Sequence, residues 1–438
     1  MYSKEILSLL KKKGIEAGDE VTIACPKGSF TGLLMPRPEG APDTFVLKLP
    51  SGYNLGISAK GASIVLVRKS GKKEIRHEPE EGRGDISILG CGGTIASKVE
   101  YKTGAVYPAI TPAELRAAFP SLAKLAKIHS RQLFTLFSED MNAHHWKLLA
   151  EEAAKEIRAG SHGVVVMHGT DTMTYTTAAL SFMLQDLPAP IVFVGAQRSS
   201  DRPSSENEMN MLNAVFSAKQ DLGEVALCMH ASSSDDYCHL HRGTRVRKMH
   251  TSRRDAFHSI NSAPIAAVDY QNNRFEPLSG YRKRSGQASG LKAETKLNDN
   301  VALVYVYPGI KPKFIEKLDS YDGVVLIGTG LGHVPVNSFN DKTAHSILPQ
   351  VKGLMDSGIP VVMAPQTIHG RLNMLVYTTG RMLVDAGVIG DGMDWTPECA
   401  FVKLCWVLGQ TKDMKKVKEL METDIAGEIS GRSPIGVY

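Results

Sequence analysis

The sequence has few cysteines, no long hydrophobic run and no large excess of charge of either sign, and each absence excludes a class of protein. Its six cysteines never occur with CxxC spacing, so a disulfide scaffold is excluded and free thiols in a reducing compartment are expected. No apolar run approaches the roughly 18 residues that a membrane-spanning helix needs. The first 14 residues lack the apolar stretch and cleavage site of a secretory signal. We therefore expect a cytoplasmic protein.

The net charge is too small to indicate nucleic-acid binding by itself. The chain carries 51 Lys and Arg against 46 Asp and Glu, a net charge of +5, and phosphate binding depends on clustered rather than net charge. Hydrophobic residues make up 42% and charged residues 22% of the chain, which is typical of a globular protein and excludes disorder as the main state. The 438 residues far exceed the common domain size of about 150, so more than one domain is expected.

The first segment of the chain has the pattern of a short amphipathic helix followed by a small β domain. Its apolar runs are short and are separated by Gly or Pro. They cover residues 21–23, 30–34, 45–49, 53–57 and 64–67. Five short strands with no helical pattern between them predict a small all-β barrel of the SH3-like kind. The charged, glycine-containing stretch 68–84 is typical of a linker, so the first domain is predicted at 1–84.

Downstream of this linker the pattern changes to strands that alternate with helices. Fully apolar runs occupy 86–89, 164–167 and 191–194, and apolar residues recur at helical spacing from Trp146 to Ile157. Buried strands that alternate with helices indicate a parallel sheet covered on both faces. An α/β lobe of the doubly wound kind is predicted at 85–285.

A second, smaller α/β lobe is predicted at 300–438. A polar stretch at its start is followed by apolar runs at 301–307, 324–327 and 361–363. Residues 397–421 have the pattern of one terminal helix, which would cover the sheet or dock a partner. The whole chain is thus expected to be a two-lobed α/β protein with parallel sheets, preceded by the barrel.

Two loops that follow apolar strands hold threonines. Thr94 follows two glycines, and Thr170 with Asp171 follows Gly169, at the strand ends where open parallel sheets bind ligands. A threonine hydroxyl becomes a nucleophile when a neighbouring base takes its proton. Lys248 is the candidate base, because a positive neighbour such as Arg247 favours the neutral amine.

Each of these three features also has a simpler interpretation. The first loop could hold a phosphate, although it matches neither GxGxxG nor GxxxxGK[ST]. Thr170 or Asp171 could cap the following helix. The basic stretch 242–254 around Lys248 could be a solvated face of the protein.

Four motifs in chain order carry a resemblance to a known family. Residues 91–96 read CGGTIA, 138–141 read SEDM, 168–172 read HGTDT, and 247–251 read RKMHT. With these motifs the chain from about 85 to 409 resembles the bacterial-type L-asparaginase and glutaminase family. It departs from the family pattern at Cys91, where the family has threonine, and at Glu139, where it has glutamine.

The resemblance implies an amidase mechanism and its catalytic residues. Thr94 would attack a side-chain amide and form an acyl-enzyme that water resolves. Thr170, Asp171 and Lys248 would form the proton-relay group. Which of the two threonines attacks stays open at this point.

The resemblance also implies substrate-binding residues, and the residues themselves give no expectation of a metal. Ser138 would bind the substrate carboxylate, and Glu139 would change how the substrate's charged groups are held, because a glutamate repels a carboxylate. The family places a tyrosine on a lid after the first motif, for which Tyr107 is favoured over Tyr101. Cys238 and two histidines at 239 and 241 suggest a metal cluster, but no fourth ligand is nearby.

The N-terminal segment is similar to the extra domain of the asparaginase-like subunits of archaeal glutamyl-tRNA(Gln) amidotransferases. In that family this subunit releases ammonia from glutamine or asparagine, and a separate E subunit binds the tRNA and activates its glutamate with ATP and Mg²⁺. The resemblance implies a chain without a cofactor of its own that works in a heteromer with the E subunit. It would contact glutamyl-tRNA(Gln) mainly through that partner.

Further expectations concern oligomeric state and the rival functions. A homodimer within a heterotetramer is implied, although Leu331 and His333 occupy the stretch where family dimers supply an asparagine to a neighbour's site. A stand-alone L-asparaginase would use the same chemistry without the partner. A catalytically silent scaffold is the third alternative, and a passive dimerisation module is the alternative for the barrel.

Overall fold

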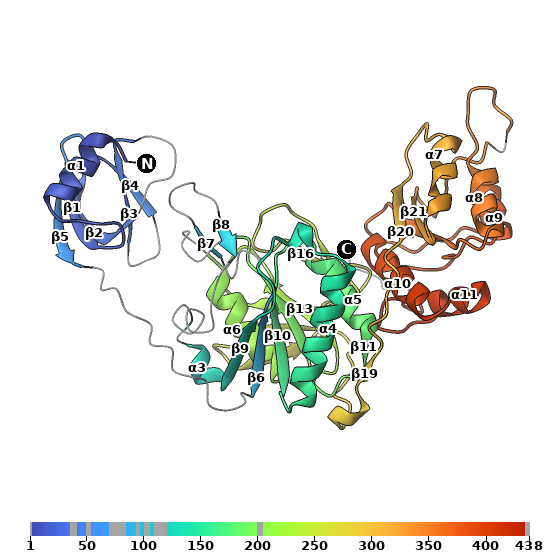
Figure 1. Cartoon of the computed structure of the whole chain (residues 1–438), viewed down its shortest axis with the longest axis horizontal. Helices are drawn as coiled ribbons and strands as arrows, with labels where there is room; N and C mark the ends of the chain where they lie inside the picture. The colour runs from blue at the N-terminus through green and yellow to red at the C-terminus, as the bar shows by residue number, and fades with distance from the viewer. Residues whose placement is uncertain are drawn as a thin grey trace.

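A computed structural model of the chain has a small β domain at one end and two α/β lobes that follow it (Figure 1). The residues that it describes are 2–35, 42–49, 54–69, 85–92, 97–99, 106–108, 119, 121–198, 205–337 and 339–433. Among them, no helix is both long and apolar enough to cross a membrane.

The N-terminal domain is a curled antiparallel sheet with the helix α1 (Lys4–Lys12) packed on it. The strands occur in the order β4-β3-β2-β1-β5. They are β1 (Glu20–Cys25), β2 (Gly28–Met35), β3 (Thr44–Lys48), β4 (Asn54–Ser58) and β5 (Ser63–Arg68). Every second residue of a strand points into the core, such as Ile23 of β1 and Phe45 of β3, which are fully buried. Ile6 of α1 is buried against them. All five predicted strands are present, and the core consists of residues of this domain alone.

The first lobe is built on an eight-stranded mixed sheet with the order β18-β17-β14-β13-β12-β10-β6-β9. Its strands are β6 (Ile86–Gly90), β9 (Ile128–Gln132), β10 (Gly163–Met167), β12 (Ile191–Val194), β13 (Val225–His230), β14 (Cys238–Arg242), β17 (Ala266–Asp269) and β18 (Arg274–Pro277). Pairing is parallel from β9 through β13 and antiparallel from β13 to β18. The predicted α/β class is confirmed, and the three antiparallel strands at one edge are an addition to the predicted parallel sheet.

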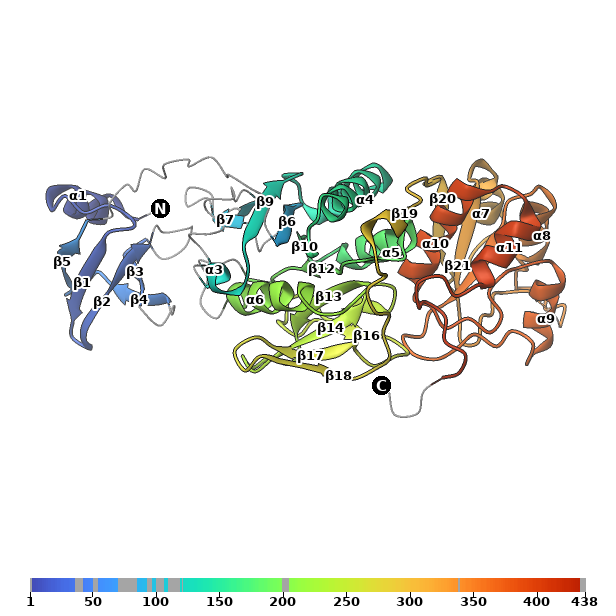
Figure 2. The same cartoon turned by 90° about the horizontal axis from the view of Figure 1, so that it is seen from below.

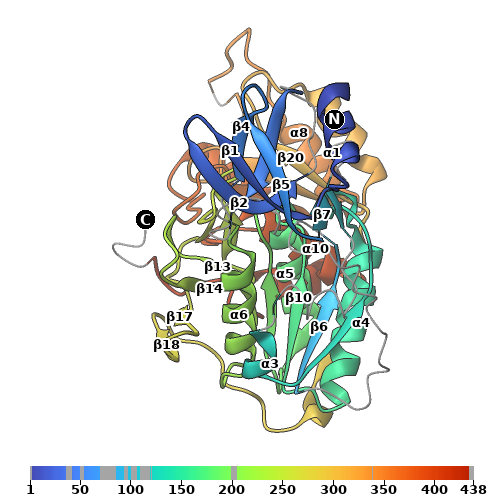
Figure 3. The same cartoon turned by 90° about the vertical axis from the view of Figure 1, so that its left-hand side faces the viewer.

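Helices cover both faces of this sheet (Figure 3). Val164 and Val166 of β10 face α4 (Ala143–Arg158) and α5 (Met173–Met183), whereas Val165 and Met167 face α6 (Asn207–Ala218). This alternation follows from the two-residue period of a strand. The apolar residues of α4 that predicted a helix are buried against the sheet.

The remaining elements of the first lobe are short. They are β7 (Ser97–Val99), β8 (Val106–Pro108), α3 (Leu122–Leu125), η2 (Ser138–Asp140), β11 (Leu184–Gln185), β15 (Val246–Lys248), β16 (Phe257–Ser259), η3 (Ala288–Gly290) and β19 (Lys292–Ala293). β7 pairs with β8, β11 with β19, and β15 with β16.

The second lobe has a three-stranded parallel sheet with the order β20-β21-β22. Its elements are β20 (Val301–Tyr305), α7 (Pro312–Glu316), η4 (Lys317–Ser320), β21 (Gly323–Gly328), α8 (Leu348–Asp356), β22 (Val361–Pro365), α9 (Thr378–Asp385), α10 (Pro397–Gln410) and α11 (Met414–Glu422). The single terminal helix predicted at 397–421 is wrong, because two helices are present. The carboxylate of Asp413 accepts a hydrogen bond from the Lys416 amide at 3.0 Å and so caps the start of α11.

The helix α10 joins the two lobes. It follows the second sheet in the chain but packs against α5 of the first lobe as well as against β21. The rings of Phe182 on α5 and Trp406 on α10 stack with centroids 6.1 Å apart. Val417 and Met421 of α11 are buried in the same core. The terminal helices therefore cover the sheets, which is the first of the two predicted alternatives.

Candidate active site

The two loops that hold the threonines leave the same edge of the first sheet. β6 and β10 are parallel neighbours with Gly90 opposite Met167, and the Cys91 amide donates to the Met167 carbonyl oxygen at 2.8 Å. Gly92 has φ +88°, and a Cβ atom there would collide with the Leu136 carbonyl oxygen. Thr94 lies outside the described residues, so its position and its role stay predictions.

Lys248 lies in direct contact with Thr170 and Asp171. Its Nζ donates to Thr170 Oγ1 at 2.9 Å and to Asp171 Oδ1 at 2.6 Å. The lysine side chain is 13% exposed, the aspartate side chain is 66% exposed, and Thr170 is buried. The structure thus brings together three of the four residues that the sequence predicts to be catalytic. A half-buried amine between a hydroxyl and a carboxylate has the contacts that proton transfer requires.

Thr170 and Asp171 do not cap the helix that follows them, so that alternative is wrong. The N-cap of α5 is Thr172, which makes no capping hydrogen bond with its side chain. Its hydroxyl donates instead to the Ser138 carbonyl oxygen at 2.6 Å. The loop after β10 is therefore held by η2 and leaves Thr170 and Asp171 directed at Lys248.

Of the predicted substrate-binding residues, Ser138 lies at the site. It is buried at the start of η2, and a Cβ atom on Gly169 would lie 2.8 Å from its Oγ. Glu139 is exposed. Tyr107 belongs to β8, opposite Lys98 of β7, and its side chain lies outside the described part of the chain. The binding roles of these three residues stay predictions.

His168 is a residue of the site to which the sequence patterns assign no role. It is fully buried between β10 and Thr170, and burial lowers its pKa to about 4. Its Nδ1 lies 2.7 Å from the Gly169 carbonyl oxygen, which only accepts hydrogen bonds, so Nδ1 carries the proton. The position of this histidine at the end of an apolar strand is the signal that could have found it.

The basic stretch around Lys248 is largely paired with acidic side chains. Each pair joins an arginine of this stretch to a carboxylate. The pairs are Arg242 with Glu224, Arg245 with Asp394, Arg247 with Glu398, Arg253 with Asp255, and Arg254 with Asp235. Residues 242–249 are buried or half-buried, so the solvated basic face is wrong for them, whereas residues 250–253 are exposed. Two of the five acids come from the second lobe.

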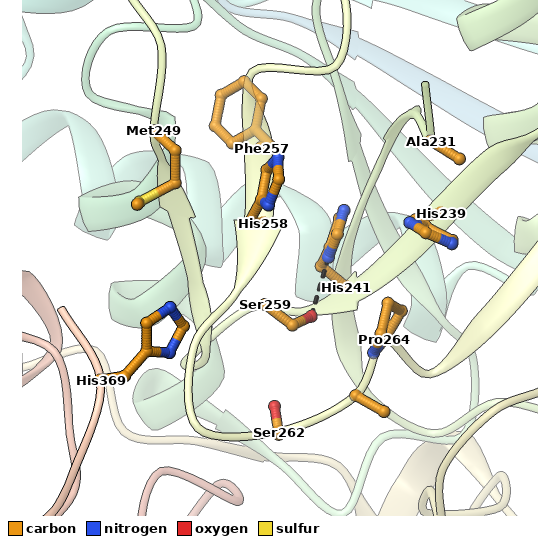
Figure 4. Close-up of a pocket in the computed structure, with 11 residues that line it drawn as sticks. Ala231, His239, His241, Met249, Phe257, His258, Ser259, Ser262, Pro264 and His369 are labelled. Atoms are coloured by element: carbon orange, nitrogen blue, oxygen red, sulfur yellow. Dashed lines mark hydrogen bonds between the residues drawn. The ribbon is translucent and has the colours of Figure 1, made fainter. Parts of the chain in front are cut away.

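A separate pocket of about 330 Å³ lies beside the β15–β16 hairpin (Figure 4). Histidines from both lobes line it: His239, His241, His258 and His369. His241 Nδ1 lies 2.8 Å from Ser259 Oγ. Cys238 is buried, and its Sγ donates to Asn210 Oδ1 at 3.4 Å. In the part of the chain that the structure describes, no three His, Cys, Asp or Glu side chains are grouped to hold a metal ion.

Family models match both lobes and the N-terminal domain. Asparaginase, N-terminal, matches residues 85–278, and the Glutaminase/Asparaginase C-terminal domain matches 300–421. The fold and the site thus define an asparaginase/glutaminase-type α/β protein. The GatD N-terminal domain model matches residues 15–67.

Curated relatives are similar to this chain over nearly its whole length. The D subunit of glutamyl-tRNA(Gln) amidotransferase from Pyrococcus furiosus is 48% identical, with 96% of each chain covered. The protein of the same name from Methanobrevibacter smithii is 45% identical, with 100% of each chain covered. The chain therefore belongs to the family of glutamyl-tRNA(Gln) amidotransferase D subunits, which confirms the predicted family.

Solved asparaginase structures match the lobes but less of the whole chain. The thermostable L-asparaginase from Thermococcus kodakarensis is 30% identical with a TM-score of 0.70, covering 79% of this chain and 99% of its own. L-asparaginase I from Vibrio cholerae is 29% identical with a TM-score of 0.68, covering 80% and 100%. These enzymes are matched almost completely, so this chain has additional residues. The predicted boundaries at 1–84, 85–285 and 300–438 stay predictions.

Proposed function

We propose that this chain is the ammonia-releasing subunit of a tRNA-dependent amidotransferase. It removes the side-chain amide of glutamine or asparagine, and the ammonia converts glutamyl-tRNA(Gln) to glutaminyl-tRNA(Gln). The observation that carries the proposal is the similarity to amidotransferase D subunits, which are 45–48% identical over nearly the full length. This similarity includes the N-terminal domain. The likeness to asparaginases alone does not account for that domain.

In the proposed reaction Thr94 is the nucleophile and the Lys248 group moves the protons. The Thr94 hydroxyl oxygen attacks the amide carbon while its proton passes to the relay of Lys248, Thr170 and Asp171. The relay returns a proton to the nitrogen, and ammonia leaves. Water then attacks the acyl-enzyme ester and releases the free acid. Backbone N–H groups at the glycine-rich turns stabilise the oxyanion, each by about 3–4 kcal/mol.

The substrate's charged groups are held beside this relay. Ser138, buried next to Gly169, donates to the α-carboxylate. Glu139 lies on the same short element and interacts with the ammonium group, since it would repel the carboxylate. Tyr107 closes over the bound amide.

The second half of the reaction belongs to the E subunit of the amidotransferase in this proposal. That partner binds the tRNA and uses ATP with Mg²⁺ to activate the glutamate, and this chain contributes no cofactor. The arginines around Lys248 are paired with carboxylates, which supports a minor role of this stretch in binding RNA. The working assembly is a homodimer of this chain with two copies of the E subunit, and it acts in the cytoplasm.

The coupled reaction tests the proposed function directly. The purified chain should release ammonia slowly, and addition of the E subunit, glutamyl-tRNA(Gln) and ATP should raise that rate together with the formation of glutaminyl-tRNA(Gln). Ammonia and aminoacyl-tRNA are measured in the same samples. Vigorous hydrolysis by the chain alone, with no response to the partner mixture, would instead identify a stand-alone asparaginase.

Substitutions in the site test the roles of the two threonines and the lysine. Thr94→Ala should abolish formation of the acyl-enzyme, whereas Lys248→Ala should lower kcat by about 10²–10⁴-fold, the usual contribution of a positioned acid or base. Rapid quenching followed by mass spectrometry locates the acyl group. The matched control is Lys292→Ala. Lys292 lies on β19 and forms an ion pair with Asp186 at 2.7 Å, and its replacement should leave kcat unchanged. An acyl group found on Thr170 would reverse the assigned roles.

A further inference from the structure

The chain after α11 turns back from the second lobe to the first (Figure 2). We call residues 424–430 the C-terminal strap. Its Glu428 forms an ion pair with Lys403 of α10, with Glu428 Oε1 and Lys403 Nζ 2.6 Å apart and both side chains fully buried. The same carboxylate accepts from the Ala426 amide at 2.6 Å. A buried pair whose charges are mutually satisfied fixes the strap to the second lobe, because separating the two charges inside the protein is costly.

The other side of the strap is bonded to the first lobe. Thr244 Oγ1 donates to the Ala426 carbonyl oxygen at 3.0 Å, and Arg245 Nε donates to the Gly427 carbonyl oxygen at 2.9 Å. Gly427 has φ +79°, and a Cβ atom there would lie 2.6 Å from Arg242 Cδ. This close approach requires glycine.

Asp394 of the second lobe connects the strap to the same arginine. Arg245 NH1 lies 3.1 Å from Asp394 Oδ2, and the two side chains are 2% and 1% exposed. The Ser430 amide donates to Asp394 Oδ1 at 3.0 Å, and the Ser430 hydroxyl donates to Oδ2. Asn261, which follows β16, donates to the Asp394 backbone carbonyl oxygen at 2.8 Å. Asp394 therefore receives bonds from the first lobe and from the strap at once.

Arg245 also closes the hairpin that carries Lys248. Its carbonyl oxygen accepts from the Ile260 amide at 2.7 Å, at the base of the β15–β16 pair, and β15 begins at the next residue and ends at Lys248. Arg247 within β15 forms a second tie to the second lobe, at 3.1 Å from Glu398. The strap, Asp394 and the lysine-bearing strand are thus joined through one buried guanidinium.

We propose that the C-terminal strap positions Lys248 against Thr170, with Asp394, Ser430 and Gly427 as positioning residues that act through Arg245. The assignment of Lys248 to catalysis rests on the proposed function. The Arg245 guanidinium donates to the backbone carbonyl oxygens of Gly427 and Asp394, at 2.9 and 3.1 Å, and to the Asp394 carboxylate. These contacts give it one orientation, and this fixes the start of β15. A displacement of about 1 Å at a reacting group costs about 10²-fold in rate, so a strap more than 170 residues from Lys248 in sequence sets the rate of the reaction.

Three substitutions of graded severity test the strap. Ser430→Ala removes one hydroxyl that bonds Asp394, Asp394→Asn removes the charge opposite Arg245, and Gly427→Ala forces the strap away from Arg242. We expect kcat for amide hydrolysis to fall about 10- to 100-fold with KM within about two-fold. The basic limb of the pH profile of kcat should shift, because Lys248 changes its partners. Amide hydrogen exchange at residues 246–248 should become faster.

A matched control separates positioning from general loss of stability. Val351→Ala empties part of the second lobe's own core, where Val351 is fully buried in a cluster that contains no residue of the strap. It should lower the unfolding temperature without changing the pH profile of kcat or the exchange of β15. The proposal is overturned if the strap variants, like Val351→Ala, change neither the pH profile of kcat nor the exchange of β15. If Asp394→Asn does not fold, the same comparison is made with Ser430→Ala. A wild-type complex that releases no ammonia would refute the proposed function, while hydrogen exchange would still test the strap.

Discussion

The buried His168, in the candidate active site, makes the free energy of unfolding depend on pH. Its pKa is about 4 in the folded protein because burial disfavours the charged ring, whereas an exposed histidine titrates near 6.5. Between these values the unfolded chain binds a proton that the folded chain does not. Stability is therefore lost as the pH falls from about 6.5 to 4, by about 3 kcal/mol for this residue. Burial also lowers the pKa of His230, His239 and His241, which adds loss of the same sign.

Replacement of His168 should remove its share of this pH dependence. In His168→Leu the free energy of unfolding should fall by about 1 kcal/mol at pH 8, since the hydrogen bond to the Gly169 carbonyl oxygen is lost. Between pH 6.5 and 4 the variant should lose about 3 kcal/mol less than the wild type. Urea unfolding at several pH values measures both differences, with His345→Leu at an exposed site as the control. Parallel curves for the wild type and His168→Leu would show that His168 does not contribute.

At the scale of elements, local patterns predict only some of the strands and helices, and long-range packing decides the rest. The five N-terminal strands and the helix α4 follow from periods of two and 3.6 residues. β14, with the sequence CHLHR, has no such apolar signal and becomes a strand by pairing with β13 and β17. The break between α10 and α11 depends on the cap formed by Asp413, which hydrophobic periodicity does not register.

The candidate site likewise contains residues that local patterns predict and a contact that only long-range packing determines. The motifs that carry Thr170, Asp171 and Lys248 are short and local, so the sequence predicts these residues, which lie in contact at 2.6–2.9 Å. The pair of Arg245 and Asp394 joins residues 149 positions apart. Such a pair depends on how the two lobes pack against each other. The sequence pattern places Arg245 in a basic stretch and does not predict its partner.

At the scale of the whole molecule, one core is shared by the two lobes, each lobe also has a core of its own, and the N-terminal domain has a separate core. α10 connects the lobes because its apolar residues pack on α5 and on β21 at once. The core of the N-terminal domain draws all its members from residues 2–66. A domain of about 60 residues buries a smaller fraction of its surface than a large one and is only marginally stable. We therefore expect this domain to unfold before the lobes and independently of them.

A single substitution in the small core tests that independence. Phe45 on β3 is fully buried, and Phe45→Ala should cost about 3–5 kcal/mol, enough to unfold the N-terminal domain at 25 °C. Hydrogen exchange should then be fast in β1 to β5 and unchanged in β10 and α5, and ammonia release by the chain alone should keep its rate. Val65→Ala, at a side chain 59% exposed on β5, should change stability by less than about 0.5 kcal/mol. Faster exchange in β10 of the Phe45 variant would mean that the domain and the lobes unfold as one unit, because independent cores cannot transmit the loss of one buried ring.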